Sequence, residues 1–114
     1  MGYSSQWCMW PLEVNGPEDR FYFERAIEYL REPDSDAWWA LDMDGGSSEW
    51  YGWRDWEGDM RRMTEKFQLM VFVLKAIGLD CDDESNWIEY WSNGRVQHEP
   101  AIVTYGDFDE RKLK

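Results

Sequence analysis

The chain has 114 residues, a formal net charge of −12, a hydrophobic fraction of 43% and an aromatic fraction of 18%. So many aromatic residues exclude a disordered acidic chain, because each buried ring removes about 150–250 Å² from water. The charge opposes binding to nucleic acid or to an anionic membrane, since those contacts depend on Lys and Arg.

Residues 1–105 are predicted to form a single α+β domain, and residues 106–114 a mobile charged tail. The longest apolar run, 69–74, is far shorter than the ~20 residues of a membrane span, and the N-terminus lacks a signal-peptide pattern. The two cysteines are too few for a disulfide framework. We therefore expect a protein of the reducing cytoplasm.

The chain begins with a predicted strand over residues 3–14, which Pro11 restricts to a sheet edge or bends. A helix is predicted from Pro17, which suits the first helical position, to about residue 32. Pro33 ends this helix because proline cannot continue the hydrogen-bond ladder.

Alternating apolar residues predict a second strand over residues 37–43, with Trp38 and Trp39 on opposite faces. The segment 44–48 contains two glycines and two serines and predicts a turn. A short third strand is expected over 49–53.

A second helix is predicted after Asp55, which suits the N-cap. Its apolar residues recur at helical spacing and form one stripe: Trp56, Met60, Met63 and Phe67. The apolar, β-branched run at 69–77 predicts a central buried strand.

Asn93-Gly94 lies between two alternating segments and predicts a hairpin with a two-residue type I′ turn. That register places two pairs opposite each other: Trp91 with Val96, and Glu89 with His98. Pro100 interrupts the second strand, which is expected to resume over 101–105.

Together these elements predict an antiparallel sheet with two helices on one face. The first six follow the ferredoxin-like βαββαβ order, and the C-terminal β-hairpin is added to them. A sheet covered on one face leaves some aromatic side chains exposed or requires the hairpin or a second copy to cover them.

The aromatic and turn positions of the C-terminal two thirds resemble a set of small phage and mobile-element proteins of ferredoxin-like fold. The resemblance rests on the following residues: Trp50-Tyr51-Gly52-Trp53, Asp59-Met60, Phe67, Phe72, Gly78, Trp87, Tyr90-Trp91 and Asn93-Gly94-Arg95-Val96-Gln97. Small acidic phage proteins frequently inhibit bacterial defence systems. The resemblance therefore implies an inhibitor of that kind, with an anti-CRISPR protein as its most specific form.

No catalytic or metal-binding motif is evident, so we expect neither an enzyme nor a cofactor. The single histidine, His98, and two distant cysteines do not make a zinc site. Two acidic loops fail as EF-hands, because the final bidentate acid falls on Trp53 or Trp91. His98 is interpreted as a strand residue that pairs with Glu89.

Acidic residues gather in two windows that contain no base, between Arg31 and Arg54 and between Lys75 and Arg95. With two aromatic anchors, these windows supply the predicted partner-binding residues: Asp34, Asp36, Asp42, Asp44, Glu49, Asp80, Asp82, Asp83, Glu84, Glu89, Trp38 and Tyr90.

The expected partner is the basic surface of a protein that itself binds nucleic acid, such as a CRISPR effector or defence nuclease in a bacterial host cell. The carboxylates would stand in for phosphates, and aromatic burial would hold the complex. The alternatives are a small-ligand-binding or homodimeric module with an aromatic pocket, a metal-dependent hydrolase, and acids that serve solubility alone.

Overall fold

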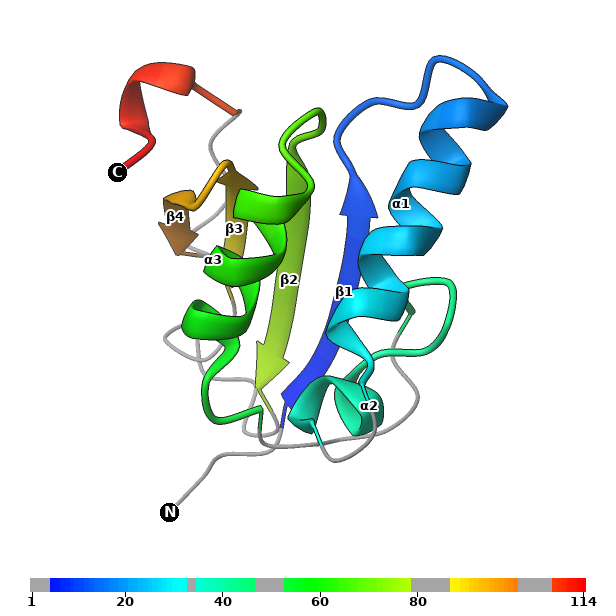
Figure 1. The fold of residues 1–114 in the computed structure, drawn as a ribbon. Coiled ribbons are helices and arrows are strands. Elements are labelled where there is room, and N and C mark those ends of the chain that lie inside the picture. Colours follow the sequence, from blue (N-terminus) through cyan, green and yellow to red (C-terminus); the bar gives the residue numbers. More distant parts are fainter. Residues whose placement is uncertain (1–4, 33–34, 47–52, 79–86, 101–107) are drawn as a thin grey trace.

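The computed structural model describes residues 5–32, 35–46, 53–78, 87–100 and 108–114, and it has an α+β fold (Figure 1). Its helices and strands are β1 (Ser5–Pro11), α1 (Pro17–Leu30), α2 (Asp36–Ala40), α3 (Trp56–Lys66), β2 (Phe72–Gly78), β3 (Trp87–Ser92), β4 (Arg95–Pro100) and a short 3-10 helix (Glu110–Lys112). No helix in the described part of the chain is long and apolar enough to cross a membrane.

The four strands form one sheet in the order β1-β2-β3-β4, and every neighbouring pair is antiparallel. Among the described strands the first lies at an edge of the sheet, one of the two outcomes expected from Pro11, and its pairing ends at Pro11 opposite Phe72. The apolar run that predicted a central strand forms β2, which pairs with β1 on one side and β3 on the other.

The hairpin of β3 and β4 confirms both the turn and the register expected from Asn93-Gly94. Asn93 has a φ of 48° and Gly94 a φ of 73°, as a type I′ turn requires. Trp91 lies opposite Val96, and Glu89 opposite His98.

Helices α1 and α3 cover one face of the sheet (Figure 1). Pro17 occupies the first turn of α1, and the carboxylate of Asp55 caps α3 by accepting the N–H of Gly58 at 3.2 Å. Met60 and Met63 on α3 are fully buried, and Trp56 and Phe67 pack beside the same core. The predicted amphipathic stripe is therefore confirmed.

The prediction of a strand over residues 37–43 is wrong, because α2 occupies Asp36–Ala40. Ala37 and Ala40 are both buried at helical spacing, and Trp38 and Trp39 are both exposed instead of facing opposite ways. The predicted third strand, over 49–53, lies almost wholly outside the described residues. The described sheet therefore supports the α+β class, and the ferredoxin-like order is not confirmed.

The segment predicted as a mobile tail contacts the sheet in its described part, residues 108–114. Val96 and Lys114 exchange two backbone hydrogen bonds of 3.0 and 2.9 Å along the outer edge of β4. On the sheet face away from the helices, the ring of Phe108 lies 5.4 Å from that of Tyr90. The described C-terminal segment therefore packs against the hairpin of β3 and β4. The strand expected over 101–105 lies outside the described residues.

Candidate partner-binding surface

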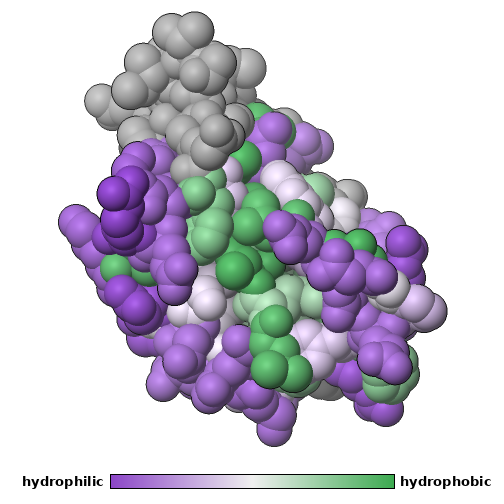
Figure 2. Space-filling view, turned by 90° about the horizontal axis from the view of Figure 1, so that it is seen from above, coloured by the Kyte–Doolittle hydropathy of each residue, from purple (hydrophilic) through white to green (hydrophobic). Residues whose placement is uncertain are grey.

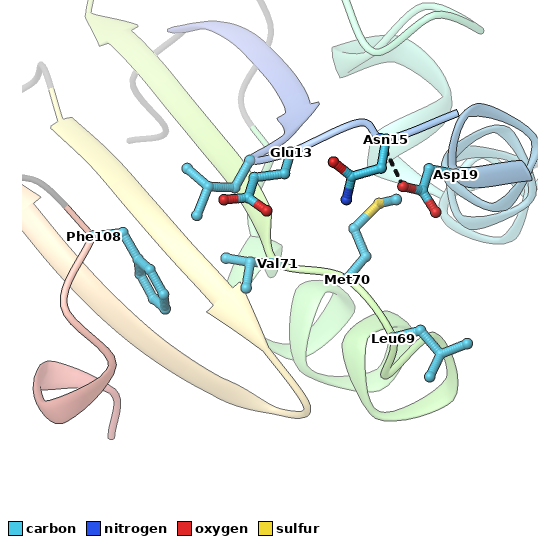
Figure 3. Close-up of a pocket in the computed structure, with 8 residues that line it drawn as sticks. Glu13, Asn15, Asp19, Leu69, Met70, Val71 and Phe108 are labelled. Atoms are coloured by element: carbon cyan, nitrogen blue, oxygen red, sulfur yellow. Dashed lines mark hydrogen bonds between the residues drawn. The ribbon is translucent and has the colours of Figure 1, made fainter. Parts of the chain in front are cut away.

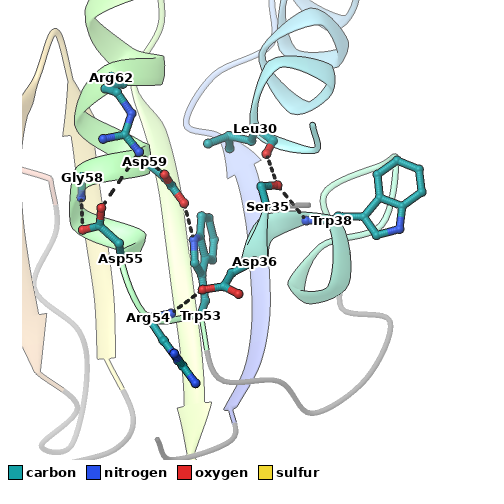
Figure 4. A network of polar contacts seen from close by, with 10 residues as sticks. All are labelled: Leu30, Ser35, Asp36, Trp38, Trp53, Arg54, Asp55, Gly58, Asp59 and Arg62. Carbon is teal, nitrogen blue, oxygen red and sulfur yellow. Dashed lines mark hydrogen bonds and ion pairs between the residues drawn. The ribbon is translucent and has the colours of Figure 1, made fainter. Parts of the chain in front are cut away.

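Helix α2 is held in place by polar contacts at its N-terminus (Figure 4). The hydroxyl of Ser35 donates to the carbonyl of Leu30 at 2.9 Å and accepts the N–H of Trp38 at 3.3 Å. The carboxylate of Asp36 accepts the backbone N–H of Arg54 at 3.1 Å. These contacts tie the short helix to the end of α1 and to the segment that leads into α3.

The turn that follows α2 packs its backbone against β1. The N–H of Asp42 donates to the carbonyl of Gly46 at 2.7 Å, and the N–H of Met9 donates to the carbonyl of Gly45 at 2.7 Å. Gly45 has a φ of 87°, and an added Cβ would lie 2.3 Å from the carbonyl oxygen of Met9. Glycine is therefore required for this turn to lie so close to the strand.

The outer side of this region exposes three large apolar side chains close together in sequence. Trp38 is 41% exposed, Trp39 51% and Met43 59%. The guanidinium of Arg31 lies over the ring of Trp38, 4.7 Å from its centroid. Because tryptophan and methionine are enriched at protein interfaces, exposed side chains of this kind favour a contact surface.

Three carboxylates, of Asp36, Asp42 and Asp44, belong to the same segment as these apolar side chains. Asp42 and Asp44 form no ion pair with any Lys or Arg in the described ranges, and the carboxylate of Asp44 accepts the N–H of Gly46 at 2.8 Å. We define the α2 surface by these side chains: Asp36, Trp38, Trp39, Asp42, Met43 and Asp44.

A second polar cluster lies on the helix-covered face of the sheet, around the carboxylate of Glu89. Glu89 is only 4% exposed. Its Oε1 accepts the indole N–H of Trp91 at 2.9 Å and that of Trp56 at 3.1 Å, and its Oε2 lies 2.8 Å from Nδ1 of His98. The carboxylate therefore satisfies two indole donors that the core would otherwise leave unpaired.

The imidazole of His98 lies at the rim of this cluster, with its side chain 47% exposed. The hydrogen bond to Glu89 raises the pKa of His98 above its ordinary value, against the opposing effect of burial, and the charges of Glu89, Glu57 and Glu99 act in the same direction as the bond. The ring of Trp87 lies 5.4 Å from the imidazole. His98, hydrogen-bonded to Glu89, can exchange a proton with solvent. The described ranges contain no group of three His, Cys, Asp or Glu side chains that could hold a metal ion.

Four of the predicted partner-binding residues lie in one segment of the structure, and two others lie on the sheet. Asp36, Trp38, Asp42 and Asp44 lie on the α2 surface. Glu89 and Tyr90 are buried on opposite faces of β3, at 4% and 8% exposure, so neither is accessible to a partner in this structure. The other six predicted residues lie outside the described ranges: Asp34, Glu49, Asp80, Asp82, Asp83 and Glu84.

Sequence reasoning did not assign Trp39 or Met43 to this surface. The signal that reveals Trp39 is Ser35, a good N-cap residue, followed by alanines three residues apart. If residues 36–40 are predicted as a helix from this signal, Ala37 and Ala40 face the core and Trp38 and Trp39 face solvent. The indole donors of Glu89 were also missed, although Trp91 shares its strand face at a spacing of two.

No family model, no curated protein sequence and no solved structure matches this chain.

Proposed function

We propose that this protein is a non-enzymatic binding protein whose α2 surface docks on a basic, nucleic-acid-binding surface of another protein. Its most specific form is a phage-type inhibitor of a bacterial defence protein, such as an anti-CRISPR protein, acting in the cytoplasm of the host cell. The observation that carries the proposal is that Trp38 and Met43 are exposed in the same segment as Asp42 and Asp44, which lack ion-pair partners in the described chain.

The charge of the whole chain supports a basic partner. A net charge of −12 attracts a basic surface over a distance of several ångströms and speeds the encounter at low salt. The carboxylates of Asp42 and Asp44 would then occupy positions that nucleic-acid phosphates take on the same partner. Nucleic acid and this protein would compete for one site.

Stability of the complex would come from the aromatic and thioether side chains. Trp38 and Met43 expose surface that a partner can remove from water, and buried tryptophans dominate the affinity of many interfaces. The backbone contacts of the α2 region with β1 and α1 fix its shape before binding. Such preorganisation lowers the entropic cost of association.

The test is an affinity capture with an immobilised protein and a nuclease-treated lysate of bacteria that carry defence systems. The captured proteins are eluted by salt, identified by mass spectrometry and purified for titration. We expect a basic nucleic-acid-binding protein whose affinity falls as salt rises, and which a nucleic-acid fragment displaces.

A matched pair of variants makes the test specific to the α2 surface. Asp42→Lys with Asp44→Lys should weaken binding by more than about tenfold, because like charges then face each other across the interface. Glu24→Lys with Glu65→Lys changes the net charge equally at exposed positions on α1 and α3 and should have a much smaller effect. Equal losses from both pairs, or binding unaffected by nucleic acid, would overturn the proposal.

A further inference from the structure

A cavity of about 370 Å³ opens at the end of the sheet opposite α2 (Figure 3). Three separate segments form it: the connection from β1 to α1 together with the first turn of α1, the connection from α3 to β2, and the chain at Phe108. Its volume lies in the lower part of the range of small-molecule sites, which is about 300–1,000 Å³.

One part of the cavity wall is apolar. Leu69, Met70, Val71 and Phe108 supply hydrocarbon and aromatic surface. Leu69 is 88% exposed at the rim, far more than the other apolar residues of the wall. Figure 2, which views the molecule from the upper end of Figure 1, shows apolar surface enclosed by hydrophilic surface.

The other part of the wall is acidic. Glu13 and Asp19 both line the cavity, and no Lys, Arg or His of the described chain does. Asp19 accepts the backbone N–H of Asn15 at 2.9 Å through one carboxylate oxygen, which fixes the side chain at the wall (Figure 3). Glu13 makes no ion pair with a base in the part of the chain that the structure describes.

We propose that this cavity binds an organic cation, a primary ammonium group carried on a hydrocarbon chain. The apolar wall would contact the hydrocarbon, and the carboxylates of Glu13 and Asp19, which Figure 3 shows apart on the wall, would make the cavity negative and attract the ammonium. Two carboxylates without a base exclude phosphates and carboxylate ligands by repulsion. A neutral hydrocarbon would contact the apolar part of the wall and would make no favourable interaction with the two carboxylates.

This binding site is independent of the proposed function of the α2 surface, because helix α2 lies at the other end of β1 (Figure 1) and no residue of the cavity wall belongs to the α2 surface. Two sources can supply the same chemistry: a free alkylamine, or a lysine side chain of another protein. The titration below first tests whether the cavity binds an ammonium group, and a lysine peptide then distinguishes the two sources.

The first measurement is a methyl NMR titration with three probes of equal chain length: hexylammonium, hexanol and hexanoate. Hexylammonium should give saturable shifts at the methyl groups of Leu69, Met70 and Val71. Hexanol should bind at least about tenfold more weakly, because it lacks the charge that the carboxylates attract, and hexanoate should give no saturable shift. Equal binding of hexylammonium and hexanol, or shifts that centre on Met43, would overturn the proposal.

Two variants and a control locate the site. Glu13→Gln and Leu69→Asn should each weaken hexylammonium binding, and both residues are exposed enough for the fold to survive. Glu24→Gln removes the same charge from an exposed position on α1 and should leave binding unchanged. A loss in Glu24→Gln equal to that in Glu13→Gln would show non-specific attraction and reject the site. Folding of each variant is checked by its methyl spectrum without probe.

The source is tested with a capped Gly-Lys-Gly peptide. Binding at least as tight as that of hexylammonium assigns the cavity to a lysine of a protein partner. Binding much weaker than that of hexylammonium assigns it to a free amine. Asp42→Lys with Asp44→Lys should leave either result unchanged, so failure of the cavity proposal and failure of the α2 proposal are distinguishable.

Discussion

The core and helix α2 contain two populations of tryptophan with opposite surroundings. Five lie in or against the core, with several of their rings 5.2–5.8 Å apart: Trp7, Trp53, Trp56, Trp87 and Trp91. Trp38 and Trp39 lie on α2 with about half of their surface in water. The same residue type therefore holds the fold together in one region and offers a contact surface in the other.

Three tryptophans of the core population depend on carboxylates, because an indole N–H needs an acceptor when it leaves water. Trp53 donates to Asp59 at 2.8 Å, and Trp56 and Trp91 share one oxygen of Glu89. Glu89 and Asp59 therefore accept hydrogen bonds from core tryptophans, whereas Asp44 is exposed and, among the described residues, accepts a hydrogen bond only within its own turn, from the N–H of Gly46. Net charge alone does not distinguish these two roles.

Truncation of one tryptophan from each population should give the largest contrast. Trp91→Ala leaves a cavity in the core and should lower the free energy of unfolding by about 3–5 kcal/mol. Trp38→Ala should change it by less than about 1 kcal/mol, since the ring is 41% exposed. Urea unfolding followed by circular dichroism measures both. Similar losses would mean that α2 is part of the core.

Removal of the Glu89 carboxylate, which two tryptophans share as acceptor, should have the next largest effect on the free energy of unfolding. Glu89→Ala leaves the indole N–H groups of Trp56 and Trp91 without an acceptor and should lower the free energy of unfolding by about 2–4 kcal/mol. Glu89→Gln keeps an amide oxygen as acceptor and should lose less. Glu65→Ala, at an exposed site on α3, is the control. A stable Glu89→Ala protein would show that the indoles find other acceptors.

The stability contributed by the α2 region should instead depend on the backbone conformation of its turn at Gly45. Gly45→Ala forces an alanine into positive φ against the carbonyl of Met9 and should cost about 1–3 kcal/mol. Gly16→Ala, whose added Cβ has nothing within 4 Å, should cost less. Thermal unfolding ranks the two variants. An unaffected Gly45→Ala protein would mean that the turn can move away from β1 freely.

The smallest expected effect is a dependence of stability on pH. Because the fold raises the pKa of His98, its protonation stabilises the protein fully below the unfolded pKa of about 6.5, and this contribution is lost as pH rises through the folded pKa. The half-exposed ring limits the effect to less than about 1 kcal/mol. Urea titrations across that pH window should show the loss in the wild type and its absence in His98→Gln. The same pH dependence in the variant would assign the proton to another group.

Local sequence signals predicted three elements. Asn93-Gly94 favours a hairpin turn, apolar residues at helical spacing favour the stripe of α3, and the apolar β-branched run favours a central strand. The segment Ala37-Trp38-Trp39-Ala40-Leu41 fits both periods, so its helix was missed. For the candidate site, Asp36, Trp38, Asp42 and Asp44 followed from charge and residue type. The burial of Glu89 did not, since it depends on Trp56, which is distant in the chain. The cavity was missed because three separate segments create it.

The pairing of Lys114 with Val96 also governs how this protein behaves when it is shortened. Deletion of residues 109–114 would free the outer N–H and C=O of Val96 and uncover the outer margin of β4. Exposed margins of this kind recruit further chains and promote aggregation. Such a deletion should lower the yield of soluble protein without altering either proposed binding surface directly.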